Sequence, residues 1–226
     1  MVKNKGLRAV IFDLDGTLLD TLRDIAEAMN RSLSAMGFPT HEIKAYRQFV
    51  GEGATVLAQR VLPEGLRHEE KIHALRELFI KDYRSNWNRY TRPYPGITGL
   101  LDTLKELRVP MAIFSNKPHY FTENCVREFL DRWPFQMVLG ESESCPRKPA
   151  PDGALKIADA IGIDPGEIVF VGDTKIDMLT AQNAGMYPCG VLWGFRDREE
   201  LLQHGAQSLL EHPGDLIDLL ALQGDG

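Results

Sequence analysis

The stretch Ala9-Val10-Ile11-Phe12-Asp13-Leu14-Asp15-Gly16-Thr17 begins as an apolar run and ends in two carboxylates that are separated by one residue. The apolar run predicts a strand that is buried on both faces. An unpaired charge inside such a strand is costly, so the two aspartates need an explanation. Either they form a turn, or the strand ends at a site where negative charge does chemistry.

The composition limits the kinds of partner that this chain can have. It has 226 residues, enough for one large domain or for a core with a smaller insertion, and its net charge is −6. Non-specific nucleic-acid binding needs a basic surface, and a membrane span needs about 20 apolar residues, which no stretch reaches. We therefore expect neither nucleic acid nor a membrane as partner. An anionic substrate would need local cations or a metal.

The cysteines and the first residues bear on the cellular compartment. Cys125, Cys145 and Cys189 lie far apart and in no CxxC spacing, which is typical of reduced thiols rather than of a disulfide framework. Residues 1–8 are basic, but Asp13 interrupts the apolar run that follows, so this is not the pattern of a signal peptide. We expect a cytoplasmic protein.

A helical block follows the first strand. Apolar residues fall at helical spacing over 22–36, over about 41–62 with an interruption at 49–53, and over 72–83. Nothing in residues 22–88 alternates as a strand does. The pattern predicts an all-helical segment inserted after the opening carboxylates and standing over them.

The remainder of the chain alternates between two patterns. Short apolar runs at 109–114, 135–139, 168–171 and 189–193 enclose helical segments at 120–130, 153–161 and 178–184. This alternation predicts an α/β fold with a doubly wound, mostly parallel sheet. We place the core domain at residues 1–18 and 94–226, and the inserted all-helical cap at residues 19–93.

Three of these predicted strands end in polar residues. Asp13 and Asp15 follow the first, Ser115-Asn116-Lys117 follows the second, and Gly172-Asp173-Thr174-Lys175-Ile176-Asp177 follows the third. Lys148 lies between the last two, just before a helix. Because ligands bind at the carboxyl ends of parallel strands, these polar ends predict one site.

The residue types in this site fit phosphoryl transfer. Asp13 can attack phosphorus and form an aspartyl-phosphate, and Asp15 can protonate the leaving oxygen and then activate water. Asp13 and Asp173 supply the one or two carboxylates that Mg²⁺ takes in proteins. The ion and Lys148 would offset the charge of a phosphate dianion, which Ser115 and backbone N–H groups can hold.

The four polar segments resemble the four motifs of the haloacid dehalogenase superfamily: DxDGT at Asp13, a Ser or Thr at Ser115, Lys148, and GDxxxD at Gly172. The resemblance implies a Rossmann-like core with a helical cap. It implies that Asp13 is the nucleophile, Asp15 the acid and base, and Ser115 and Lys148 phosphate ligands; we group Asn116 with them. The metal ligands it implies are Asp13, the backbone carbonyl of Asp15, and Asp173, with Asp177 in support.

Each motif also has a simpler interpretation when taken alone. Asp-Leu-Asp-Gly is often a plain turn, and a lysine before proline is usually solvated. Ser115 can cap a helix, and Asp177 can act on a helix dipole alone. The order of all four motifs, and their positions on the predicted elements, favour the catalytic interpretation.

The glycine-flanked loop of the cap predicts the substrate. Residues 49–57 (FVGEGATVL) and 192–195 (LWGF) are similar to the phosphoglycolate phosphatase branch of the superfamily. The resemblance places substrate specificity at Arg47, Gly51, Glu52 and Gly53, with Arg47 as a possible partner of a substrate carboxylate. Gly51-Glu52-Gly53 can also simply connect two helices, and Arg47 can be solvated.

Three alternatives stay open beside a Mg²⁺-dependent phosphoglycolate phosphatase. One is a phosphatase of sugar phosphates, nucleotides or pyrophosphate, and another is a mutase similar to β-phosphoglucomutase, since both use the same core motifs. The third, a non-catalytic phosphate-binding module, is disfavoured because Asp13, Asp15, Lys148 and Asp173 are all present. In each enzyme case the partner is a small phosphorylated metabolite, and the protein is a monomer or a homodimer.

Overall fold

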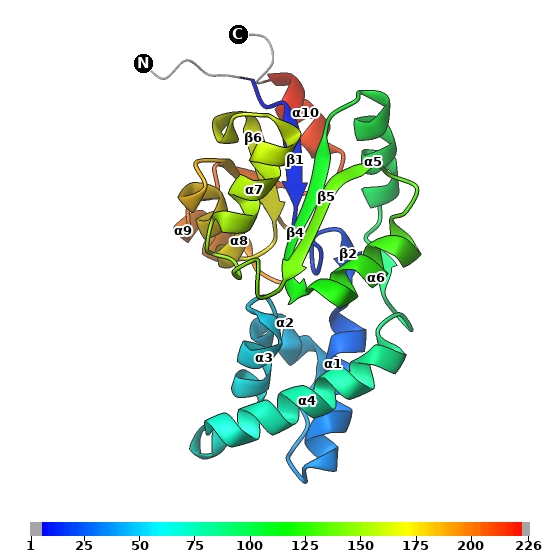
Figure 1. Ribbon diagram of the computed structural model, residues 1–226, viewed down its shortest axis with the longest axis vertical. Coiled ribbons are helices and arrows are strands. Elements are labelled where there is room, and N and C mark those ends of the chain that lie inside the picture. Colours follow the sequence, from blue (N-terminus) through cyan, green and yellow to red (C-terminus); the bar gives the residue numbers. More distant parts are fainter. Residues whose placement is uncertain (1–5, 223–226) are drawn as a thin grey trace.

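A computed structural model describes residues 6–222 of the chain and has two parts, a sheet flanked by helices and a group of helices at one end of it (Figure 1). The strand arrows of the sheet point toward that helical group. The carboxyl ends of the strands therefore face the helices, as the sequence predicts.

The sheet is parallel throughout and has β1 near its centre. In spatial order its strands are β5 (Phe135–Glu141), β4 (Met111–Pro118), β1 (Ala9–Phe12), β6 (Ile168–Gly172), β7 (Tyr187–Val191) and β8 (Ser208–Leu210). All four residues of β1 are buried. The predicted doubly wound, mostly parallel sheet is confirmed.

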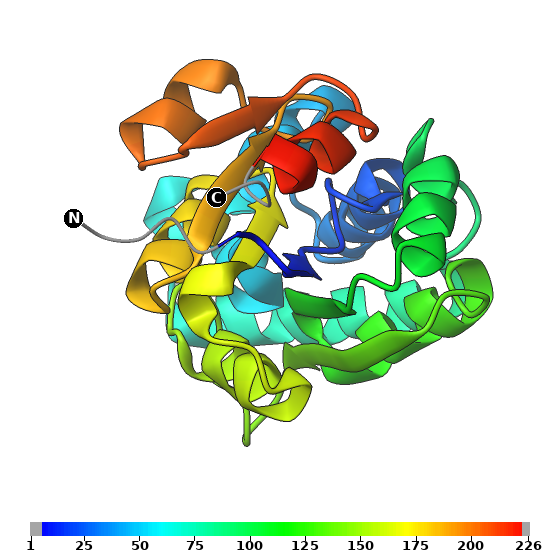
Figure 2. The same cartoon turned by 90° about the horizontal axis from the view of Figure 1, so that it is seen from above.

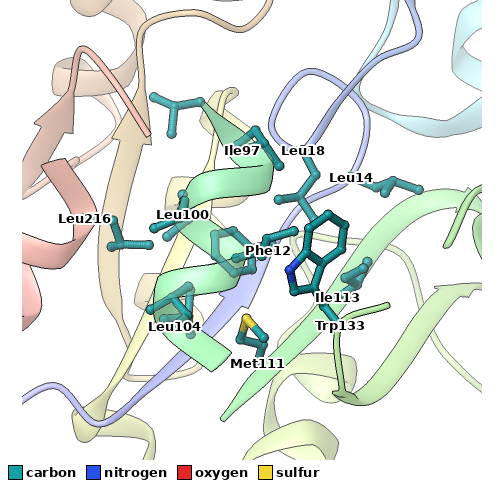
Figure 3. Close-up of a cluster of buried hydrophobic side chains, with 14 of the residues drawn as sticks. Phe12, Leu14, Leu18, Ile97, Leu100, Leu104, Met111, Ile113, Trp133 and Leu216 are labelled. Carbon is teal, nitrogen blue, oxygen red and sulfur yellow. The ribbon is translucent and has the colours of Figure 1, made fainter. Parts of the chain in front are cut away.

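Helices cover both faces of this sheet (Figures 1 and 2). They are α5 (Ile97–Glu106), α6 (His119–Phe129), α7 (Asp152–Ile161), α8 (Lys175–Asn183), α9 (Arg198–Gln203) and α10 (Asp215–Leu222). Val10 and Phe12 pack into the cluster under α5 and α10, shown in Figure 3, while Ile11 faces α7 and α8. The period of two along β1 thus divides the core between the two faces.

The inserted segment is helical, as predicted. Its helices are α1 (Leu22–Ala35), α2 (Tyr46–Phe49), α3 (Gly53–Val61) and α4 (Glu69–Asn86), with short 3₁₀ turns at Ile43–Ala45 and Glu64–Leu66. We call α1 to α4 the cap. A second apolar cluster, separate from those of the sheet, lies mainly in the cap and includes Met29 and Leu33 of α1 and Leu75 and Phe79 of α4.

The chain enters and leaves the cap through a two-stranded antiparallel ladder that the sequence analysis did not predict. Its strands are β2 (Leu19–Asp20) and β3 (Arg92–Pro93), and the predicted domain boundaries fall directly before the first and after the second. The buried carboxylate of Asp24 joins the two passages, since its Oδ2 accepts bonds from the backbone N–H (2.8 Å) and the hydroxyl (2.7 Å) of Thr91. Within residues 6–222, no helix has both the length and the apolar character needed to cross a membrane.

Candidate active site

The polar strand ends meet at one edge of the sheet. Strand β1 lies between β4 and β6 and is parallel to both, so Asp13 after β1, Asp173 after β6 and Ser115 within the second half of β4 lie at the same edge of the sheet. All three are buried, and the cap stands over them (Figure 1). The structure thus brings these side chains together, as the sequence predicts.

Lys148 lies between two carboxylates of this group. Its Nζ is 2.8 Å from Oδ1 of Asp13 and 2.6 Å from Oδ1 of Asp177. Burial lowers the pKa of Lys148, but the two carboxylates outweigh burial, so the pKa lies above its ordinary value. Burial raises the pKa of Asp13 to about 7, and Lys148 opposes that rise. Lys148 thus stays a cation, and it favours the ionised form of Asp13.

Three buried carboxylates form a set that suits a divalent cation. One oxygen each of Asp13, Asp173 and Asp177 lies within 4.8 Å of the others. Oδ2 of Asp173 accepts a bond from the backbone N–H of Phe195 (2.7 Å), while its buried Oδ1 has no hydrogen-bond partner among residues 6–222. Burial and the two neighbouring carboxylates raise the pKa of Asp173 well above its usual range. A bound cation would satisfy the unpaired oxygen and lower this repulsion.

Asp177 differs from the other two carboxylates because both of its oxygens are engaged. Oδ1 accepts from Lys148, and Oδ2 accepts from the backbone N–H (2.9 Å) and the hydroxyl (2.8 Å) of Thr174 at the start of α8. Asp177 therefore holds Lys148 and the turn between β6 and α8 in place beside Asp13 and Asp173. This position suits the supporting role that the sequence analysis expects.

Two glycines make room for Asp173. Gly16 has a φ of 90°, and a Cβ built there would lie 2.2 Å from Oδ2 of Asp173. A Cβ on Gly194 would lie 2.2 Å from Cβ of Asp173. Larger residues would displace the carboxylate, so the glycine of the DxDGT motif has a steric reason as well as a conformational one.

Asp15 pairs with a lysine that the sequence analysis did not select. Nζ of Lys117 lies 3.0 and 3.1 Å from the two carboxylate oxygens of Asp15, and 2.9 Å from the hydroxyl of Tyr83 on α4. Burial lowers the pKa of Lys117, but Asp15, Tyr83 and Cys125 together outweigh burial, and the pKa is raised well above its ordinary value. The signal for Lys117 was its position in the polar end Ser115-Asn116-Lys117.

A cavity lies between the strand ends and the cap. From the core it is lined by Asp13, Asp15, Ser115, Asn116, Lys117, Pro118 and Phe121, and from the cap mainly by Val50, Gly51, Gly53, Ala54, Leu57, Phe79 and Tyr83. Its volume is about 50 Å³. Because one water needs roughly 10 to 15 Å³ of such space, the cavity suits a small molecule. Polar groups form its floor, and apolar side chains form most of its roof.

Ser115 and Asn116 differ in what their side chains contact. Ser115 is buried on the cavity wall, where its Oγ accepts the backbone N–H of Lys117 at 3.2 Å. The side-chain amide of Asn116 binds backbone instead: Nδ2 donates to the carbonyls of Gly51 (3.2 Å) and Lys148 (3.1 Å), and Oδ1 accepts from the N–H of Lys148 (2.7 Å). This amide joins the Lys148 segment to the loop that follows α2, while Asn116 also lines the cavity, and its contact with phosphate stays a prediction.

Of the four cap residues that the sequence analysis links to substrate specificity, the two glycines lie at the cavity and the two charged residues do not. Gly51 and Gly53 line the cavity. Arg47 and Glu52 are not in its lining, because Arg47 donates to the backbone carbonyls of Gly194 and Phe195, and Glu52 pairs with Arg60. The predicted contact between Arg47 and a substrate carboxylate does not fit this arrangement.

Arg47 belongs instead to a reciprocal contact between cap and core. Arg196 of the core donates to the carbonyls of Arg47 and Val50 (2.9 Å for the latter) at the end of α2, while Arg47 binds the core loop. The ring of Phe195 packs in the apolar cluster of the cap, and its backbone N–H holds Asp173. The loop of residues 194–196 thus contacts both the cap and Asp173.

Comparison with known proteins adds a family and several relatives. Residues 10–191 match the family described as haloacid dehalogenase-like hydrolase. The chain is 33% identical over 215 residues to phosphoglycolate phosphatase 1 of Pseudomonas aeruginosa, covering 93% of this chain and 78% of the relative. It is 30% identical over 214 residues to the phosphoglycolate phosphatase of Aquifex aeolicus, covering 95% and 97%. A crystal structure from Lactobacillus delbrueckii subsp. bulgaricus, provisionally assigned as a phosphoglycolate phosphatase, has a TM-score of 0.90 at 29% identity, covering 95% and 98%.

Proposed function

Because this chain belongs to the haloacid dehalogenase-like hydrolase family, we propose that it is a Mg²⁺-dependent phosphatase that hydrolyses 2-phosphoglycolate through an aspartyl-phosphate. The observation that carries the proposal is the buried arrangement of Asp13, Lys148 and Asp173, in which Asp13 also lines a small cavity beneath the cap. The relatives that are named phosphoglycolate phosphatase support the choice of substrate.

Asp13 is the nucleophile in this proposal. Its carboxylate lines the cavity, and Lys148, at 2.8 Å, favours the ionised form that attack on phosphorus requires. The attack transfers the phosphoryl group to an Asp13 oxygen and releases the alcohol. In this proposal Lys148, beside Asp13, and Ser115, on the cavity wall, hold the phosphate oxygens and act on the charge that develops in transfer.

Asp15 acts as acid and then as base. In the first step its carboxyl group donates a proton to the leaving ester oxygen. In the second step the carboxylate takes a proton from the water that attacks the aspartyl-phosphate. Lys117 binds both oxygens of Asp15 and holds this side chain at the cavity, apart from the Asp13–Lys148 pair.

Mg²⁺ fits the acidic set because Asp173 has a buried oxygen that lacks a partner within the described residues. Asp13, Asp173 and the backbone carbonyl of Asp15 would hold the ion, with Asp177 and Lys148 behind them. When bound, Mg²⁺ supplies positive charge that offsets the phosphate dianion and the carboxylates.

The cap excludes bulk water from the reaction. Val50, Leu57 and Phe79 present apolar surface to the cavity, so closure places the phosphate in a medium of low polarity. Opening must then admit substrate and release product, which makes cap motion part of the catalytic cycle. The two passages at β2 and β3 are the only covalent links between cap and core within residues 6–222.

The test is kcat/KM for phosphate release across a panel of 2-phosphoglycolate, sugar phosphates including β-glucose 1-phosphate, nucleotides and pyrophosphate. We expect Mg²⁺-dependent hydrolysis with a clear preference for 2-phosphoglycolate, and no release by the Asp13→Asn variant purified in the same way. A preference for sugar phosphates or nucleotides would contradict the substrate. Conversion of β-glucose 1-phosphate to an isomer without phosphate release would favour a mutase.

A further inference from the structure

Arg196 lies between core and cap with its charge out of solvent. Its side chain is 6% exposed, and on the core side its Nε is 3.2 Å from Oε1 of Glu200. On the cap side its two terminal nitrogens donate to the backbone carbonyls of Arg47 and Val50, the latter at 2.9 Å. A buried guanidinium needs such acceptors, because a donor without a partner is costly where water is excluded. The cap therefore completes the bonding of this core residue.

The residue before Arg196 is held by the cap and in turn holds an acidic side chain of the core. The ring of Phe195 is 3% exposed and packs in the apolar cluster that lies mainly in the cap. Its carbonyl accepts a bond from Arg47 at 3.3 Å. Its backbone N–H donates to Oδ2 of Asp173 at 2.7 Å. The position of this N–H, and so the carboxylate that it binds, depends on where the cap stands.

Asp173 responds to this neighbour because it is tightly enclosed. A Cβ on Gly194 would lie 2.2 Å from Cβ of Asp173, so the loop of residues 194–196 packs directly against the side chain. The bond from Phe195 occupies one carboxylate oxygen, while the other is buried and has no partner within residues 6–222. Holding the first oxygen fixes the direction of the second, which is the one left for a metal ion.

Arg196 is better placed than Arg47 to control this loop. Arg47 is exposed, and water can replace the two carbonyls that it binds when the cap moves away. Arg196 is buried and contacts core and cap at the same time, so separation of the two parts leaves its cap-facing nitrogens without acceptors. Loss of these contacts frees the loop that orients Asp173.

We propose that Arg196 is a positioning residue that couples cap closure to the metal site: docked on the cap carbonyls, it fixes the loop whose Phe195 N–H orients Asp173. The affinity for Mg²⁺ then depends on the position of the cap. By reciprocity, Mg²⁺ favours the closed cap by the same factor. This inference rests on the proposed function, because it assumes that Asp173 is a metal ligand.

The first test is a calorimetric titration of the substrate-free protein with Mg²⁺. Arg196→Met keeps a long side chain and removes the guanidinium. It should weaken Mg²⁺ binding by about 10-fold, the lower end of the range for residues behind metal ligands. Arg198→Met is the matched control, because Arg198 is 56% exposed and pairs with Glu211 rather than with the cap. It should bind Mg²⁺ as the wild type does.

Arg196→Lys provides a variant that keeps the charge. An ammonium group is a single point and cannot bind Glu200 and two carbonyls as a guanidinium fork does. We expect Mg²⁺ binding to weaken by about 2- to 10-fold, the range for one lost hydrogen bond. This variant decides the question even if Arg196→Met does not fold. If Arg196 only holds the cap shut, both variants raise KM for the ester and leave the Mg²⁺ affinity of the substrate-free protein unchanged, which overturns the inference.

The second test asks whether the metal site acts back on the cap. Amide hydrogen exchange is followed with and without Mg²⁺ in the peptides that cover residues 46–53 of the cap and 192–197 of the core. In the wild type, Mg²⁺ should slow exchange in both peptides, by about 10-fold in the cap peptide if coupling is reciprocal. In folded Arg196→Met the cap peptide should no longer respond. Slowing that is confined to residues 192–197 of the wild type would refute the coupling.

The wild-type protein separates this inference from the proposed function. If it neither binds Mg²⁺ nor needs it for phosphate release, the proposed cofactor fails and the inference fails with it. If it binds Mg²⁺ and hydrolyses 2-phosphoglycolate, but the folded Arg196 variants bind Mg²⁺ as tightly, the inference alone is wrong. A change of substrate in the phosphatase panel leaves the inference untouched, since both tests are made without substrate.

Discussion

Nζ of Lys148 lies 2.8 Å from Oδ1 of Asp13, and both side chains are buried. This pair answers the question that the carboxylates at the end of a buried strand raise. The negative charge of Asp13 has a partner there because the Lys148 cation is buried beside it. The same cation then faces the phosphate that Asp13 would attack. The pair thus serves both the fold and the proposed chemistry.

Replacing Asp13 by asparagine should abolish turnover while the fold is kept. The amide has almost the same shape as the carboxylate but cannot form the phosphoenzyme. We expect kcat to fall by at least about 10⁴-fold. Phosphate release measures the loss, and circular dichroism with thermal unfolding verifies the fold. Substantial residual activity in a folded variant would sink the nucleophile assignment.

Replacing Asp15 by asparagine should affect esters according to their leaving groups. With 2-phosphoglycolate, whose leaving alkoxide needs a proton, kcat should fall by about 10² to 10⁴-fold. With p-nitrophenyl phosphate, the first step needs no proton, but the second step still lacks its base. We expect a burst of one equivalent of p-nitrophenol followed by a stall. Steady turnover at the wild-type rate would point to another acid and base.

Removing divalent cations should silence the enzyme reversibly. A chelator followed by dialysis should leave a folded, inactive protein, and added Mg²⁺ should restore activity and raise Tm, because the ion satisfies Oδ1 of Asp173. In Asp173→Asn the rise in Tm with Mg²⁺ should largely disappear. Full activity after complete metal removal would contradict the proposed cofactor.

The stability of the metal-free protein should fall as pH rises between about 4 and about 7. Burial raises the pKa of Asp13 from 3.8 to about 7, so in this window the folded state holds a proton that the unfolded state has lost. That contribution is complete below the unfolded pKa and is lost as pH passes the folded one. Urea unfolding near pH 5 and near pH 8 measures it. Asp13→Asn should show a smaller loss over this window, and an equal loss in both proteins would contradict the shift.

Replacing Gly16 by alanine should weaken the metal site specifically. The added Cβ would lie 2.2 Å from Oδ2 of Asp173, so the carboxylate must move. We expect the Mg²⁺ concentration for half-maximal activity to rise by about 10- to 100-fold, as for other residues that orient metal ligands. Gly37→Ala is the matched control, because Gly37 also has a positive φ (74°) but has no atom within 4 Å of the added Cβ. Equal effects of the two substitutions on Mg²⁺ dependence would indicate backbone strain alone.

Most of the core could be predicted because its signals are local. Short apolar runs between helical segments predicted β1, β4, β5, β6 and β7, and the polar residues at the carboxyl ends of β1, β4 and β6 predicted a common site. In a parallel sheet, neighbouring strands have their carboxyl ends at the same edge, so order along the chain was enough. The ladder of β2 and β3 was missed because each strand has only two residues, and no pattern of that length stands out.

The sequence by itself determined that Asp13, Asp15, Ser115, Lys148 and Asp173 would meet, because each lies near the end of an element whose type and direction the local pattern indicates. Only the tertiary structure decided which charges pair: Lys117 with Asp15 and Tyr83, and Arg47 with the carbonyls of Gly194 and Phe195. These partners lie 34 to 148 positions apart in the chain. A long cationic side chain binds whichever acceptors the packing of cap on core brings within about 3 Å, and hydrophobic periodicity carries no information about that choice.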